Sequence, residues 1–308
     1  LLASNDVTIS NSQIYNNGFN GLYIQSISDA DLFKNDFEGN GLSELKIVSS
    51  YDIILEDNFF NATEFDGGGW GIDTSSSSKI DIGNNMLQLG IKLYDADNFT
   101  IYNNEFNNIT YGNNYEQKTA ILIGGHDNII SNNIINNVGF GLVFLTDADN
   151  NLIENNTILG ASTDVEYYTL GQNNTFINTE INTVDILDNI YFETLNYVDI
   201  QLFTVNGPVE GVELNIRNGE VAVYSTEYYG GSDDITSSDG FIDRLFLVNE
   251  IYDDDWIAED VDTVIEYYYD GEAYSYNLDT DTSRYQEIYV NLRPTAGISY
   301  IKGIGDNS

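Results

Sequence analysis

A six-residue motif of the form apolar-x-Asn-Asn-x-apolar occurs eight times between Ile9 and Ile181 of the 308-residue chain. Successive copies lie 19 to 29 residues apart, and the commonest step is 23 residues. The fourth position of the motif is held in turn by Ser12, Asn35, Asn58, Asn85, Asn104, Asn133, Asn156 and Thr179. A repeat of this length without helical spacing predicts stacked coils, each of which buries its apolar face against its neighbours.

Each repeat also contains an apolar-x-apolar segment, such as Leu45-Lys46-Ile47, which predicts a strand with one buried and one exposed face. A coil of this size has room for two or three short strands, so we predict an all-β parallel β-helix of about eight coils. We expect the fixed Asn to adopt left-handed backbone angles and to stack its amide about 4.8 Å from the next one, forming a ladder. A second polar column, three residues before each motif, suits another turn: Asp6, Asp29, Asp52, Lys79, Asn98, Asp127, Asn150 and Asn173.

With these repeats, residues 1–184 resemble the right-handed β-helix proteins with PbH1-type repeats. These belong to the pectate-lyase-like superfamily, which includes NosD-type proteins and carbohydrate-binding or sugar-hydrolase modules. The resemblance implies the fold more specifically than the function, because that superfamily contains lyases, hydrolases, adhesins and inert surface proteins.

The pattern changes in residues 185–308, where longer alternating strands are separated by turn signals such as Asn218-Gly219 and Asp270-Gly271. About seven antiparallel strands predict a β-sandwich domain. Residues 207–214 and 236–241 resemble immunoglobulin-like or carboxypeptidase-regulatory-like modules of surface proteins. Such modules usually act as spacers or assembly surfaces.

The composition restricts the partners and the location of the protein. A net charge of −40, from 50 acidic against 10 basic residues, repels nucleic acid and anionic membranes. The absence of Cys excludes disulfides and thiolate metal sites. Acidity, abundant Tyr and few Lys favour an exported protein of a microbial, and in particular an archaeal, cell surface. Five Asn-x-Thr sequons are candidate glycosylation sites: Asn61, Asn98, Asn108, Asn155 and Asn173.

Three charged residues fall on the exposed side of neighbouring predicted strands, with Lys46 and Lys92 one coil on either side of Asp73. One interpretation is a polysaccharide-cleaving site in which Asp73 is the acid or a metal ligand and a Lys is the base. The other is a cross-strand charge ladder that offsets the acidic excess. The context of Asp73 resembles part of the polygalacturonase pattern, but the second carboxylate that glycoside hydrolysis needs is replaced by Lys92.

Two longer repeats contain insertions at residues 61–70 and 107–119. If both leave the same edge, they form the walls of a carbohydrate-binding groove. Trp70, Tyr111 and Tyr115 would then stack on sugar rings, and Glu64, Asp66 and Glu116 would bind hydroxyls or Ca²⁺. The alternatives are ordinary loop elaboration and a subunit contact.

Two further features concern metals. Loop carboxylates at Asp253, Asp254, Asp255, Asp279 and Asp281 are candidate ligands for Ca²⁺, or else a solvated acidic surface. His126 is the only histidine, which excludes metal centres built from several histidines, and we predict a plain turn residue.

The sequence therefore favours a non-catalytic extracellular surface protein, such as a surface-layer, adhesin or filament-type subunit. We expect it to self-associate through the β-helix ends or the sandwich domain, to contact cell-surface glycans, and neither to bind nucleic acid nor to insert in membranes. The alternatives are a polysaccharide lyase or hydrolase acting in a groove, and a carbohydrate-binding module.

Overall fold

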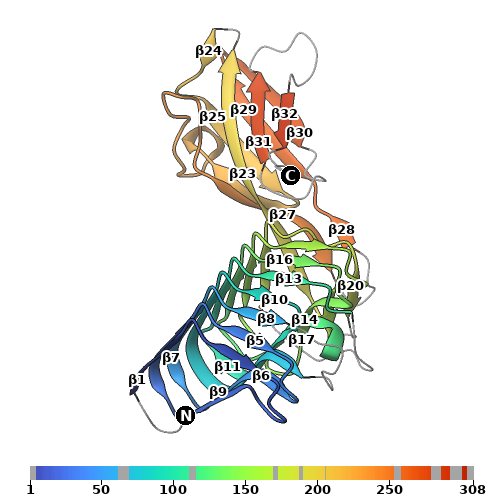
Figure 1. Ribbon diagram of the computed structural model, residues 1–308. Helices are drawn as coiled ribbons and strands as arrows, with labels where there is room; N and C mark the ends of the chain where they lie inside the picture. Colours follow the sequence, from blue (N-terminus) through green and yellow to red (C-terminus); the bar gives the residue numbers. More distant parts are fainter. Residues whose placement is uncertain are drawn as a thin grey trace. The chain divides into compact units, whose positions relative to one another are not determined.

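The computed structural model describes residues 5–61, 69–110, 116–168, 173–186, 190–204, 206–252, 258–278, 286–291 and 300–303. Within these ranges the chain is all-β, and its only helices are two 3-10 turns, η1 (Glu116–Lys118) and η2 (Glu227–Tyr229). Neither of these short helices, the only ones described, is long and apolar enough to cross a membrane. The chain divides into two compact units, one formed mainly by residues 1–192 and the other mainly by residues 193–252 and 257–308 (Figure 1).

The first unit is a parallel β-solenoid of about seven turns, in which each turn contributes strands to three faces. Face 1 contains β1 (Asn5–Ser10), β4 (Ser28–Phe33), β7 (Tyr51–Glu56), the second half of β9 (Trp70–Gly83), β12 (Thr100–Tyr102), β15 (Ile129–Ser131), β18 (Leu152–Glu154) and β21 (Thr175–Ile177).

Face 2 contains β3 (Leu22–Gln25), β6 (Ser43–Val48), the first half of β9, β11 (Ile91–Asp97), β14 (Thr119–Gly124), β17 (Phe140–Phe144), β20 (Thr163–Tyr167) and β22 (Val184–Ile186). Face 3 is a seven-stranded sheet of β2 (Gln13–Tyr15), β5 (Asp36–Glu38), β8 (Phe59–Asn61), β10 (Met86–Leu87), β13 (Glu105–Asn107), β16 (Ile134–Asn136) and β19 (Thr157–Leu159). The eight motif copies give only seven strands here, because the described residues that follow Thr179 do not form another strand of face 3.

The predicted amide ladder is present at the corner between faces 1 and 3. Both the backbone N–H and the side-chain Nδ2 of Asn58 donate to Oδ1 of Asn85, at 2.8 and 3.0 Å. Asn58 Nδ2 also donates to the carbonyl of Leu32 in the preceding turn, at 2.9 Å. The ladder residues are at most 2% exposed from Asn35 to Asn156. Each amide therefore connects three successive turns and leaves little of its hydrogen-bonding capacity unused.

The left-handed residue of the motif is not the ladder Asn, as the sequence had suggested, but the residue before it. These residues have φ between 49° and 55°: Asn11, Lys34, Asp57, Asn84, Asn103, Asn132, Asn155 and Asn178. The chain turns at this position, so the next side chain points into the corner and stacks. Short polar side chains dominate this set because they tolerate left-handed angles better than other non-glycine residues.

A second internal ladder supports the corner between faces 2 and 1 in the later turns. Asn128 Nδ2 donates to Asn151 Oδ1 at 2.9 Å, and Asn151 Nδ2 donates to Asn174 Oδ1 at 2.9 Å. Each of these residues follows a residue of the second polar column, and all eight members of that column have φ between 53° and 59°. The column thus bends the chain at each coil, although four of its members lie within strands rather than in separate turns: Asp6, Asp29, Asp52 and Lys79.

The solenoid core is filled by apolar side chains stacked in register between turns. Phe37 lies parallel to Phe60 with ring centroids 4.9 Å apart, and Phe144 lies parallel to Tyr167 at 4.4 Å. Both stacks are fully or almost fully buried. Packing of like residues in columns follows from the fixed coil-to-coil register, which brings equivalent positions of successive repeats together.

The second unit contains β23 (Phe192–Thr204), β24 (Gly207–Pro208), β25 (Glu213–Asn218), β26 (Val221–Ser225), β27 (Leu245–Tyr252), β28 (Ala258–Asp260), β29 (Thr263–Tyr269), β30 (Glu272–Leu278), β31 (Gln286–Asn291) and β32 (Tyr300–Gly303). A four-stranded antiparallel sheet runs in the order β26-β25-β29-β30. Its buried residues share one apolar cluster with residues of β23 and β27. The strands are not all antiparallel as expected, because β23 and β31 pair in parallel.

We predict that Asn85→Ala strongly destabilises the solenoid. The change removes the acceptor of two Asn58 donors and the donor to the Leu55 carbonyl, all of them buried. Each buried polar group left unpaired costs about 1–3 kcal/mol, so the free energy of unfolding should fall by at least about 3 kcal/mol in denaturant titrations. The control Met86→Ala removes a neighbouring side chain that is 47% exposed, and should cost less than about 1 kcal/mol. Equal losses in the two variants would contradict the ladder's role.

Candidate functional site

The outward column predicted on face 2 is in continuous register from turn to turn, although Leu122 and Val143 within it are buried. Its members, in order, are Tyr23, Lys46, Asp73, Lys92, Leu122, Val143 and Glu166. Lys46 Nζ lies 2.7 Å from Asp73 Oδ2, and the two side chains are 21% and 17% exposed. The other oxygen, Asp73 Oδ1, is buried and has no hydrogen-bond partner among the described residues. The Asp73 carboxylate therefore forms a partly buried ion pair with Lys46.

Lys92 points toward Trp70 and Glu116. Its Nζ lies 5.9 Å from the centroid of the Trp70 ring and 3.9 Å from Glu116 Oε2. The Trp70 ring is only 8% exposed, because it packs with Leu122 and Val143 on the outside of the solenoid. Most of the ring face is thus covered and is not available to stack on a sugar.

The remaining residues of the predicted carbohydrate groove, Tyr111, Tyr115, Glu64 and Asp66, lie outside the described residues. The same holds for the predicted calcium ligands Asp253, Asp254, Asp255, Asp279 and Asp281. Within the described ranges, no group of three or more His, Cys, Asp or Glu side chains is arranged to hold a metal ion. Carbohydrate binding by the two insertions and calcium binding by these acidic loops therefore stay predictions.

Glycosylation of the five sequons likewise stays a prediction, although all five Asn residues are described. Four of them, Asn98, Asn108, Asn155 and Asn173, have left-handed backbone angles at coil corners, whereas Asn61 ends a strand of face 3. Some of their side chains already bond to the neighbouring turn: Asn178 donates to Asn155 Oδ1 at 2.7 Å.

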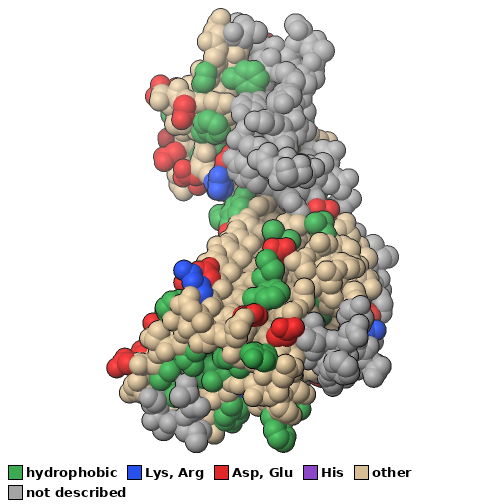
Figure 2. Space-filling model, viewed as in Figure 1, with side chains coloured by type: hydrophobic (Ala, Val, Ile, Leu, Met, Phe, Trp, Pro, Cys, Tyr) green, Lys and Arg blue, Asp and Glu red, His purple; other side chains and the backbone are tan. Residues whose placement is uncertain are grey.

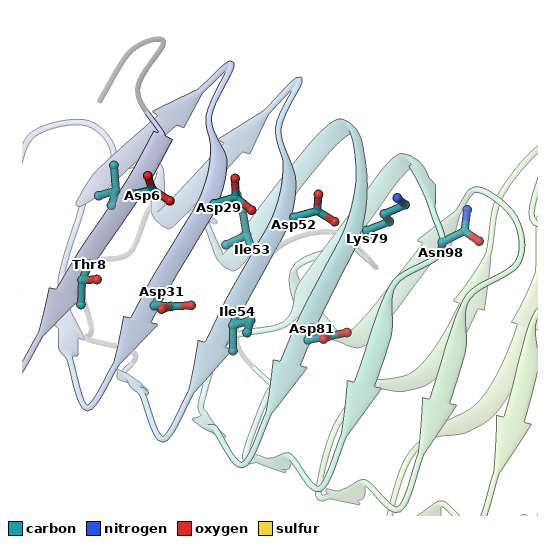
Figure 3. Close-up of a pocket in the computed structure, with 11 residues that line it drawn as sticks. Asp6, Thr8, Asp29, Asp31, Asp52, Ile53, Ile54, Lys79, Asp81 and Asn98 are labelled. Atoms are coloured by element: carbon teal, nitrogen blue, oxygen red, sulfur yellow. The ribbon is translucent and has the colours of Figure 1, made fainter.

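A groove of about 520 Å³, which the repeat pattern does not predict, lies on the outside of face 1 (Figure 3). Two rows of side chains line it. One row consists of the corner residues Asp6, Asp29, Asp52, Lys79 and Asn98. The other consists of the outward strand residues Thr8, Asp31, Ile54 and Asp81. The corner row was visible in the sequence as a turn signal, but only the stacking of the coils places the second row beside it.

The groove combines negative charge with a small apolar floor. Five carboxylates face one ammonium group, that of Lys79, so the electrostatic potential in the groove is negative. Ile54 lies between Asp31 and Asp81 in register and is 42% exposed. On the face drawn in Figure 2, basic side chains are few, consistent with the net charge of −40. Such a site suits a ligand that offers several hydrogen-bond donors and some apolar surface.

His126 bridges two carboxylates farther along the same edge of the solenoid and is therefore more than the plain turn residue that we predicted. Its Nδ1 lies 2.8 Å from Asp127 Oδ2 and its Nε2 lies 3.2 Å from Asp97 Oδ1. The hydrogen bond with Asp127, helped by the charge of Asp97, raises the pKa of His126 above its usual value. The side chain is 50% exposed, so solvent and salt weaken the interaction.

The comparisons with known proteins bear on the fold of the first unit. The family described as "Right handed beta helix region" matches residues 1–88. No curated protein sequence matches the chain. Among solved structures, the enzymatically active domain of tailspike protein 2 of bacteriophage CBA120 is similar at 10% identity and a TM-score of 0.21, over 91% of this chain. The chain spans 66% of that domain's length. The family match and the parallel register of the strands together identify the first unit as a right-handed parallel β-helix.

We predict that Lys46 and Asp73 are energetically coupled. In a double-mutant cycle with Lys46→Met and Asp73→Asn, the coupling free energy should be about 1 kcal/mol or more, because the pair is close and partly buried. A cycle on Lys92 and Glu116, whose charged atoms are 3.9 Å apart, serves as the control and should give a value near zero. Equal coupling in both cycles would show that the Lys46–Asp73 contact has no special role.

The stability contributed by His126 should depend on pH. Because its pKa is higher in the folded than in the unfolded state, protonated His126 stabilises the fold fully below its unfolded pKa, and the effect disappears as pH rises through the folded value. The stability difference between the parent protein and His126→Gln should therefore be larger at pH 5 than at pH 9. Denaturant titrations at both pH values measure it, and a difference that grows with pH would refute the assignment.

Proposed function

We propose that the protein is a non-catalytic extracellular surface protein, of the surface-layer, adhesin or filament type, and that its β-helix contacts carbohydrate in the groove on face 1. The observation that carries this proposal is the groove itself, where carboxylates, an amide and a hydroxyl surround the exposed Ile54. Carboxylates and amides accept hydrogen bonds from sugar hydroxyls, while an aliphatic side chain packs against the C–H groups of a sugar ring.

The charge of the groove favours a particular class of glycan. A uronic-acid polymer would bring further negative charge against Asp29, Asp31 and Asp52, whereas a neutral or amino-substituted sugar would not. We therefore infer that the ligand is a neutral or an amino-sugar polysaccharide rather than an acidic one.

Two observations on face 2 support the absence of catalysis there. Asp73 already has Lys46 as an ion-pair partner, and the residue in register on its other side is Lys92 rather than a carboxylate. Glycoside hydrolysis ordinarily needs two carboxyl groups on either side of the scissile bond. Among the described residues, no second carboxyl group lies beside Asp73 in register.

A polysaccharide hydrolase is the alternative function, and two aspartates in the groove on face 1 favour it. Asp31 and Asp81 are two strands apart in register, across Ile54, which places their Cα atoms about 9–10 Å apart. Inverting glycosidases hold their two carboxyl groups about 6.5–9.5 Å apart, and two aspartates two strands apart on one face could bring their carboxyl groups to such a separation.

The second unit would act as a spacer or an assembly surface. Its two sets of strands bury a common apolar cluster, which supports the predicted β-sandwich. Self-association, binding of Ca²⁺ and membership of the pectate-lyase-like superfamily belong to the same proposal. Sedimentation at several protein concentrations, with and without Ca²⁺, would test the first two.

Binding to a glycan array tests the proposed function. The parent protein should bind neutral or amino-sugar oligosaccharides and not uronic-acid ones. The double variant Asp31→Asn/Asp81→Asn should lose at least tenfold in affinity, whereas Glu38→Gln, an exposed carboxylate on face 3, should change it less than twofold. Affinity that is unchanged in the double variant would rule out the groove.

The same samples distinguish a binding protein from an enzyme. Incubation with the bound polysaccharides should release no new reducing ends and no unsaturated products. Products that appear with the parent protein and disappear with Asp31→Asn/Asp81→Asn would instead establish the hydrolase alternative.

A further inference from the structure

A second candidate site lies in the other unit, on the outward face of the sheet formed by β26, β25, β29 and β30. Leu214 and Ile216 point inward to the apolar cluster, so Glu213 and Asn215, which alternate with them, point outward. Tyr268 is in register with Glu213, and Glu266 is in register with Asn215. The outward face therefore brings aromatic and hydrogen-bonding side chains together.

Tyrosine rings form a stacked platform at one end of this face. The ring of Tyr228, from η2, lies parallel to that of Tyr268 with centroids 4.4 Å apart and an interplanar angle of 16°. Tyr229 lies at 80° to Tyr228 with centroids 5.0 Å apart. Tyr228 remains 54% exposed although it contacts both rings. The contacts fix the ring while leaving a large part of it open to solvent, which lowers the entropy cost of binding a ligand there.

Polar groups surround the platform. The Tyr229 hydroxyl is buried and has no hydrogen-bond partner among the described residues. The pKa of Tyr229 is raised by burial and by the nearby carboxylates of Glu266 and Glu213. Glu266 is held in place, because Asn215 Nδ2 donates to its Oε2 at 2.6 Å. A buried hydroxyl without a partner is costly, and a ligand hydroxyl that reached it after a small shift of the Tyr229 side chain would remove that cost.

Among the described residues, strand β30 presents small side chains beside the platform. Ala273 is in register with Tyr268, and Ser275 is in register with Glu266. Both are exposed, and both have small side chains. The described residues of β30 therefore leave room for a ligand on Tyr228 to extend across this strand.

We propose that this face is a second carbohydrate-binding site, at which one ring of a neutral oligosaccharide stacks on Tyr228 and its hydroxyls bond to Tyr229 and Glu266. An oligosaccharide ring presents apolar C–H groups on its faces and hydroxyls at its edge, and this matches an exposed aromatic ring bordered by hydrogen-bonding groups. An anionic sugar is disfavoured by Glu213, whereas the charge of Glu266 is partly offset by Arg217, whose Nη2 lies 3.6 Å from Glu266 Oε1. The site is independent of the groove on face 1.

The experiment uses the full chain carrying Asp31→Asn/Asp81→Asn, in which binding by the groove is weakened at least tenfold. Calorimetric titrations use soluble hexasaccharides of glucose, of mannose and of N-acetylglucosamine as probes. At least one should bind, and adding Tyr228→Ala should weaken that binding at least tenfold, whereas Tyr228→Phe should keep it within about threefold. The matched control is Tyr94→Ala, a solenoid tyrosine that is 57% exposed, which should leave the affinity within twofold.

Tyr229→Phe separates a binding role from a structural one. Because the hydroxyl has no partner among the described residues, its removal should not lower the free energy of unfolding, yet it should weaken oligosaccharide binding about fivefold. The proposal is overturned if none of the three probes binds, or if Tyr228→Ala binds as tightly as the background chain. Loss of binding in Tyr94→Ala to the same extent as in Tyr228→Ala would also overturn it.

Discussion

The chain turns a corner three times in every coil of the solenoid, and at the corner between faces 1 and 3 side-chain amides take over the hydrogen bonding that strands provide elsewhere. Asn85 shows how complete this replacement is. Its Oδ1 accepts the backbone N–H and the Nδ2 of Asn58, while its own Nδ2 donates to the next amide and to the carbonyls of Leu55 and Gly83. Without these bonds, buried polar groups at every turn would lack partners, and the apolar columns inside could not remain in register.

The same turn-to-turn register determines which side chains lie next to one another on the outer surface of the solenoid. Corner residues must tolerate left-handed angles, so they are mostly Asn and Asp, and stacking collects them in a row. Where the chosen residue is Asp, as at Asp29 and Asp52, the turn requirement also produces negative charge. The groove on face 1 thus arises where a geometrically required row adjoins outward strand residues such as Asp31. A binding surface of this kind needs no dedicated loop, because the scaffold itself positions its side chains.

The sequence predicted the features that depend on a strict repeat. The ladder from Asn35 to Asn156 and the turn column follow from spacing alone. The position of the left-handed residue was wrong by one, because adjacent Asn residues occupy both places in copies such as Asn132-Asn133, and spacing does not separate their roles. The burial of Trp70 could not be foreseen from its insertion, because it comes from packing against the outward residues Leu122 and Val143 of other turns. The groove and the Tyr228 platform depend on residues far apart in sequence, which periodicity does not relate.

The amide ladder ends at Thr179, and the way it ends bears on how the number of repeats can change. Thr179 accepts the N–H of Asn156 and gives its single proton to the carbonyl of Ile177, so no amide is left over beyond it. Every interior amide has identical neighbours above and below. Excising or duplicating one whole repeat would therefore recreate the same pairing at the seam. The steps of 27, 19 and 29 residues between bonded ladder amides show that a repeat can also change in length away from this corner. Solenoids of this type can therefore gain or lose turns, or vary the length of a turn, while the amide ladder stays intact.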